Sequence, residues 1–94
     1  MPQNNHHDVI FKYLVRLPTS DCIFCSTQEP TTGRRKLFLI FNQEERIYSR
    51  NALQGTWDEI KDAEQYNVIR QKFSQAVTER TVPYYSTLPN GEDV

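Results

Sequence analysis

A chain of 94 residues has room for one small domain with a single modest core. Its residues are 37% hydrophobic and 12% aromatic, which excludes an intrinsically disordered chain. The formal net charge of −1 gives the chain as a whole no electrostatic attraction to DNA or to a membrane surface.

The sequence shows no targeting or membrane-spanning signal. No window approaches the run of about 18 apolar residues that reads as a membrane span. Residues 1–8 lack the basic and apolar regions of a signal peptide, and they are expected to be a flexible N-terminal segment. Two cysteines and no Asn-Xaa-Ser/Thr sequon agree with a reducing compartment. We therefore expect an intracellular protein, cytoplasmic or nuclear.

Four strands are predicted in the first half of the chain. Residues 9–17 alternate at period two and place one fully apolar set on one side: Val9, Phe11, Tyr13, Val15 and Leu17. Turn residues at 18–21 lead into a β-favouring run at 22–25, which predicts a hairpin. Residues 36–41 and 46–50 are predicted strands three and four, joined by a short polar connection. These features predict an antiparallel meander.

Helical signals follow in the second half. Thr56 and Glu59 fit a capping box, which predicts a short helix at 57–61. Asp62 followed by Gln65 can cap a longer helix at 63–80, and one curved helix is the alternative. Pro83 ends the helical region, so residues 83–94 are predicted to be a tail and residues 9–82 a single domain. Tyr84 and Tyr85 are either packed on the sheet or an exposed ligand, and packing is favoured.

The predicted fold is α+β: about four antiparallel strands, open or curled into a half-barrel, with the helical region packed on the sheet. The third strand raises a question because both of its faces are apolar. Leu37, Leu39 and Phe41 share one side, and Phe38 and Ile40 share the other. One helix covers one face only. Either the chain itself or a partner protein must cover the second.

Cys22 and Cys25 form a C-x-x-C pattern, which can be half of a zinc site or a redox pair. The other soft ligands are His6 and His7, which are adjacent residues in a polar segment. Positions i and i+3 of a strand point to opposite faces, so either use needs a local turn. We expect two structural cysteines, with no metal and no cofactor.

Catalytic signatures are also missing from the sequence. The three glycines form no phosphate-binding loop, and no serine elbow is present. A nucleophile, a base and an electrostatic stabiliser cannot all be assigned. We expect a non-enzymatic protein-interaction module, such as an adaptor, a regulator or a subunit, that binds another protein or a second copy of itself. The predicted partner-binding residues are Ile10, Leu14, Phe38, Ile40 and Tyr48.

The alternative is a domain that binds single-stranded nucleic acid. Arginine can contact phosphates while aromatic rings stack on bases. Charges that flank an apolar strand also guard against edge aggregation, and this explanation is favoured. The residues of the alternative site are Arg34, Arg35, Lys36, Arg46, Arg50 and Tyr13.

Overall fold

A computed structural model describes residues 9–17 and 21–89, so the predicted N-terminal segment 1–8 and the end of the tail, 90–94, lie outside the described residues. Within them the chain forms six strands and one α-helix, in the α+β class that the sequence predicts. The elements in chain order are β1 (Ile10–Arg16), β2 (Cys22–Gln28), β3 (Arg35–Phe41), β4 (Arg46–Asn51), β5 (Thr56–Glu59), α1 (Ala63–Glu79) and β6 (Tyr84–Tyr85).

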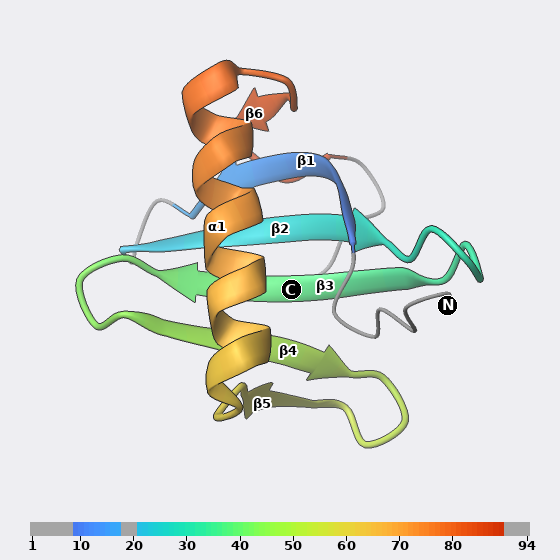
Figure 1. The fold of residues 1–94 in the computed structure, drawn as a ribbon. Helices are drawn as coiled ribbons and strands as arrows, with labels where there is room; N and C mark the ends of the chain where they lie inside the picture. The colour runs from blue at the N-terminus through green and yellow to red at the C-terminus, as the bar shows by residue number, and fades with distance from the viewer. Residues whose placement is uncertain (1–8, 18–20, 90–94) are drawn as a thin grey trace, which may run out of the picture.

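The strands form one open sheet in the order β5-β4-β3-β2-β1-β6 (Figure 1). Strands β1 to β5 are antiparallel neighbours, which confirms the predicted meander. The sheet has six strands rather than about four. It does not close into a barrel, because β5 and β6 are two separate edges.

Helix α1 crosses one face of the sheet from β5 to the β1–β6 edge (Figure 1). Its buried residues, Ile69, Phe73 and Ala76, recur at helical spacing and form one apolar stripe. This stripe packs on the face of the sheet that is turned toward α1, and we call that face the helix face. The core cluster consists of Val9, Leu14, Ile23, Cys25, Phe38, Ile40, Ile47, Ile60, Ile69 and Phe73.

The segment Thr56–Glu59 is a strand, so the prediction of a helix at 57–61 is wrong. Gly55, with φ of 69°, turns the chain back, and its amide donates to the carbonyl of Asn51 at 2.7 Å. The Thr56 hydroxyl donates to Asp58 Oδ1 at 2.9 Å instead of capping a helix. Pairing with β4 supplies the backbone hydrogen bonds that a helix would have made. The capping-box pattern is therefore a coincidence in a hairpin.

The predicted cap at Asp62 is confirmed. Its side chain accepts a hydrogen bond from the amide of Gln65 at 3.0 Å, and α1 begins at the next residue, Ala63. At the other end Arg80 adopts the left-handed conformation with φ of 54°, and its amide donates to the carbonyl of Ala76. One helix replaces the two that were predicted.

A bulge in β1 overturns its predicted single apolar face. Phe11 pairs with Thr27 and Tyr13 pairs with Ser26, so the register shifts at Lys12. The extra residue places Phe11 on the helix face and Tyr13 on the opposite face. Period-two counting through the bulge therefore fails.

The segment predicted as a tail extends the sheet. The amide of Leu14 donates to the carbonyl of Pro83 at 2.8 Å, and Tyr84 and Tyr85 pair in parallel with Leu14 and Val15.

Among the described residues, no helix has the length and apolar character needed to cross a membrane.

Candidate interaction surface

Three of the predicted partner-binding residues lie in the core. Leu14, Phe38 and Ile40 are at most 1% exposed beneath α1. Strand pairing places these side chains next to one another. Cys25 of β2 pairs with Leu14 of β1 and with Phe38 of β3, and Ile40 lies two residues further along β3 on the same face. The helix covers this face, so the prediction that these three side chains are open to a partner is corrected. Ile10, which is 49% exposed, and Tyr48, which is half-buried, lie on the other face.

The face opposite α1, called here the open face, carries the second apolar set of β3. Leu39 pairs with Tyr48 and Phe41 with Arg46, so these four side chains share that face. Arg50 and Trp57 pair on the same side at the β4–β5 end. The open face presents Ile10, Tyr13, Val15, Cys22, Phe24, Ser26, Gln28, Arg35, Leu37, Leu39, Phe41, Arg46, Tyr48, Arg50, Trp57, Glu59 and Tyr85.

Exposure on the open face rises from β2 toward β5. Phe24 and Val15 are fully buried, and Cys22 is nearly so. Beyond β2 the side chains are partly exposed. We call the five apolar and aromatic side chains among them the outer patch: Leu37, Leu39, Phe41, Tyr48 and Trp57. Within the described part of the chain, α1 is the one helix, and it lies on the face opposite this patch.

Each arginine of the open face contacts an aromatic side chain. Arg35 Nη2 donates to the Tyr13 hydroxyl at 2.8 Å, and Arg46 Nη1 donates to the Tyr48 hydroxyl at 3.5 Å. The guanidinium carbon of Arg50 lies 5.4 Å from the centroid of the Trp57 ring. The Phe41 and Tyr48 rings meet edge to face, with centroids 5.6 Å apart. The three arginines, Arg35, Arg46 and Arg50, therefore place positive charge beside the outer patch, and we call them the rim.

The positive charge of Arg46 is stabilised by its neighbours. The hydrogen bond to the Tyr48 hydroxyl is the largest cause that raises the pKa of Arg46, followed by attraction to Tyr48, Glu59 and Glu44. Arg46 is fully exposed to water, so the acidic neighbours screen its charge without burying it. The rim can still attract an acidic partner.

The structure brings together four of the six residues predicted for nucleic acid: Tyr13, Arg35, Arg46 and Arg50 all lie on the open face. The other two lie elsewhere. Arg34 is exposed in the loop between β2 and β3. Lys36 pairs with Thr27 on the helix face, and its Nζ lies 3.9 Å from the Glu29 carboxylate.

Both cysteines are reduced and buried in β2. They point to opposite faces, since Cys22 pairs with Phe41 and Cys25 with Phe38. Burial, followed by the Asp21 carboxylate, raises the pKa of Cys22 to about 11. Burial is also the main cause that raises the pKa of Cys25 well above its usual value. Both groups are therefore protonated thiols near neutral pH, and a protonated thiol is a poor nucleophile.

No group of three or more His, Cys, Asp and Glu side chains is close enough to hold a metal ion within residues 9–17 and 21–89. His6 and His7 lie outside those residues.

Sequence reasoning missed most of the outer patch. The alternation of β3 separated its two apolar sets correctly, but no local signal shows which set the helix covers. Trp57 was assigned to a helix, so its place beside Arg50 was not foreseen. The hairpin signal that could have found it is Gly55, which adopts a positive φ at the end of the short turn after Asn51.

Comparison of the chain with models of known protein families, with curated proteins and with solved structures finds no match.

Proposed function

We propose that this chain is a non-enzymatic protein-interaction module that binds its partner through the outer patch. One observation carries the proposal: an apolar strip, Leu37, Leu39 and Phe41, lies partly exposed on the sheet face opposite α1, which no helix of the described residues covers. Tyr48 and Trp57 extend the strip, and arginines flank it. An apolar centre with aromatic residues and arginine around it is the usual composition of a protein-binding site.

Burial of the strip would supply binding free energy. Complete burial of a leucine or phenylalanine side chain stabilises by about 1.5–3 kcal/mol relative to full exposure. The three strip residues are already half-buried, so a partner would gain a fraction of this from each. Aromatic residues and arginine at the centre of an interface often contribute about 2 kcal/mol or more when truncated. Trp57, as a member of the outer patch, is suited to that role, and Arg50 lies beside it on the rim.

Charge indicates which kind of partner fits. The open face carries Arg35, Arg46 and Arg50, with Glu59 as the acidic residue among the paired positions. A symmetric dimer built on this face would place the same cationic rim on both sides of the interface. Opposite charges favour encounter, and like charges disfavour it. We therefore propose another protein, with an apolar and acidic surface, rather than a second copy.

The first experiment measures whether the patch is accessible. We expect a dye that reports exposed apolar surface to bind the folded protein, and Leu39→Ser to reduce that binding. Leu53→Ser is the matched control, because Leu53 is 99% exposed at the tip of the β4–β5 hairpin, outside the patch. Circular dichroism verifies that both variants are folded. A monomer in sedimentation experiments that takes up no dye would contradict the proposal.

The second experiment uses the partner. Affinity capture from the native source, followed by titration of the captured protein, should give a dissociation constant that Leu39→Ser and Trp57→Ala each weaken by about tenfold or more. Leu53→Ser should bind like the wild type. A captured protein whose affinity is the same for all variants would show that it binds elsewhere.

Single-stranded nucleic acid is the second candidate, and a specific observation favours it: three arginines each contact an aromatic ring or hydroxyl on one sheet face. Arginine beside an exposed ring can contact a phosphate while the ring stacks on a base. The aliphatic centre of the strip cannot stack, which is why this function ranks second.

A mobility-shift titration with an unstructured oligonucleotide separates the two functions. Nucleic-acid binding requires a shift at low salt that weakens as salt rises, because phosphate contacts release counterions. Arg46→Gln and Arg50→Gln should each weaken the shift, and Arg34→Gln serves as the control outside the face. No shift at low salt would remove this candidate.

A further inference from the structure

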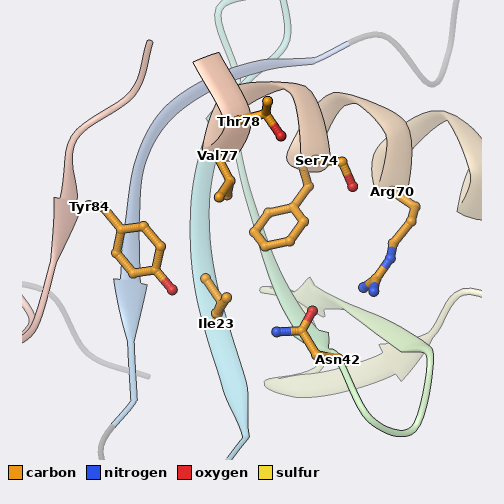
Figure 2. A pocket seen from close by; sticks show the side chains of 8 residues that line it. Ile23, Asn42, Arg70, Ser74, Val77, Thr78 and Tyr84 are labelled. Carbon is orange, nitrogen blue, oxygen red and sulfur yellow. The ribbon is translucent and has the colours of Figure 1, made fainter. Parts of the chain in front are cut away.

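A pocket of about 310 Å³ lies between α1 and the sheet on the helix face, away from the outer patch (Figure 2). It is formed where α1 passes over the start of β2 and the end of β3. Figure 2 shows Arg70 running from the helix toward Asn42, which follows β3. The lining residues are Ile23, Asn42, Arg70, Phe73, Ser74, Val77, Thr78 and Tyr84.

Arg70 carries the argument, because one of its nitrogen atoms is buried without a partner. Nη1 is inaccessible to solvent and has no hydrogen-bond acceptor. The guanidinium carbon lies 5.9 Å from the centroid of the Phe73 ring, which offers a weak cation–π contact and no acceptor. Arg70 makes no ion pair with any residue in the described part of the chain.

An unpaired, buried donor of a charged group is costly, and folded proteins rarely keep one unless it serves a ligand, an ion or a catalytic step. Nη1 itself is out of reach of a ligand, so a ligand would contact the part of the guanidinium that stays accessible; Arg70 is half-buried and lines the pocket. An oxyanion suits this group best, because arginine forms strong charge-assisted bonds with carboxylates and phosphates. The Arg70 guanidinium is therefore poised to receive a negatively charged group.

The neighbours of Arg70 provide further donors. Ser74 and Thr78 follow it by one and two helical turns, on the same side of α1. Their hydroxyls and the Asn42 amide can all donate to an anion. Acidic residues at 44 and 45 occupy the turn after Asn42, yet no carboxylate of residues 9–17 and 21–89 lines the pocket. The polar part of this lining therefore offers one cation and several hydrogen-bond donors to an anion.

Apolar side chains define the rest of the ligand. Ile23, Phe73 and Val77 line the pocket beside the donors, and the Tyr84 ring borders it. The volume is at the small end of the range for ligand sites, about 300–1,000 Å³. A bare inorganic ion would leave this apolar wall without contacts.

We propose that this pocket binds a carboxylate or phosphate group carried on a compact apolar body, with Arg70 as its charged anchor. The donors that assist are Asn42, on the side toward which the guanidinium extends, and Ser74, on the helix above it (Figure 2). The proposal is independent of the outer patch, since the two sites lie on opposite faces of the sheet.

The test is a titration of the isotope-labelled protein followed by NMR. Four probes are used: benzoate, phenyl phosphate, inorganic phosphate and neutral benzamide. We expect saturable shifts of the amide signals of Asn42, Ser74 and Thr78 with benzoate or phenyl phosphate, and none with benzamide. Benzoate alone would assign a carboxylate ligand, and phenyl phosphate alone a phosphate monoester. Both results support the proposal, whereas equal shifts with benzamide would overturn it.

The decisive variant is Arg70→Met, which keeps an apolar stem and removes the charge. We expect it to weaken the binding of the successful probe by about tenfold or more, since a charge-assisted hydrogen bond is lost. Lys61→Met is the charge-matched control, because Lys61 is exposed and lies outside the pocket; it should bind like the wild type.

Stability provides a second readout. If Arg70 only stabilises the fold, Arg70→Met should be less stable to heat than the wild type. If Arg70 is a ligand anchor that is unpaired in the ligand-free protein, Arg70→Met should be at least as stable as the ligand-free wild type. Loss of stability together with unchanged probe binding would overturn the proposal. So would the absence of saturable shifts with all three anions.

Discussion

Phe38 and Leu39 are consecutive residues of β3, and they lie on opposite faces of the sheet in different surroundings. Phe38 is 1% exposed beneath α1 and pairs with Cys25. Leu39 pairs with Tyr48 on the open face, where it is partly exposed. The first side chain therefore stabilises the fold, and the second is available for binding.

This relationship predicts unequal costs of truncation. Phe38→Ala should lower the free energy of unfolding by about 3–5 kcal/mol, because it leaves a cavity in a core that cannot fully collapse. Leu39→Ala should cost less than about 2 kcal/mol, since part of its side chain is already in water. Chemical denaturation of the two variants measures both values. Equal losses would show that the open face is as closed as the helix face.

The helix start can be tested with two substitutions. Asp62→Ala should destabilise by about 1 kcal/mol, because the Gln65 amide loses its acceptor. Thr56→Ala should stay within about 0.5 kcal/mol of the wild type, since its hydroxyl bonds only the exposed Asp58 carboxylate. Thermal or urea unfolding provides the comparison. A larger loss at Thr56 than at Asp62 would restore the capping-box interpretation.

The turn between β4 and β5 depends on the backbone of Gly55. A side chain added there would meet nothing within 4 Å, so space is not limiting. Its φ of 69° is in the left-handed region, which costs most L-residues about 1–2 kcal/mol. Gly55→Ala should therefore lower the free energy of unfolding by that amount, and Gly55→Asn by less. If alanine and asparagine cost the same in urea denaturation, backbone conformation is not the cause.

The two buried thiols predict a loss of stability at alkaline pH. The folded protein raises the pKa of Cys22 from 9.0 to about 11, mainly through burial. The folded state therefore holds this proton more tightly than the unfolded state. The resulting stabilisation is fully present below pH 9 and is lost as the pH rises through about 11. Burial of Cys25 acts in the same direction.

Urea denaturation at several pH values between 9 and 11 measures this slope. The Cys22→Ala/Cys25→Ala double variant should show a shallower decline over that range. Its remaining slope includes Tyr84, because burial raises the pKa of that phenol as well. A slope that the double variant does not change would show that the thiols are not its source.

Local pattern was sufficient for much of the fold. The alternation of residues 9–17 and the apolar run at 36–41 predicted β1 and β3, and the Asp62 cap predicted the start of α1. These features depend on interactions within a few residues: the period of the strand and a side chain bonding an amide three positions on. The α+β class follows from them.

Tertiary structure decided which apolar set of β3 became the core. Phe38 and Ile40 are no more hydrophobic than Leu39 and Phe41, so composition does not distinguish the two faces. The bulge at Lys12 aligned Leu14 with the first set, and the β4–β5 hairpin positioned α1 to cover it. Pairing with β4 also made Thr56–Glu59 a strand.

The candidate sites were likewise beyond local pattern. Arg50 and Trp57 meet because β4 and β5 pair, and Arg70 approaches Asn42 because α1 crosses the end of β3. Sequence determined which side chains can pack, donate or carry charge. Only the fold brought residues that are distant in the chain into contact. The arrangement is selected by the free energy gained when a whole face of the sheet is buried, and no local preference of the chain determines it.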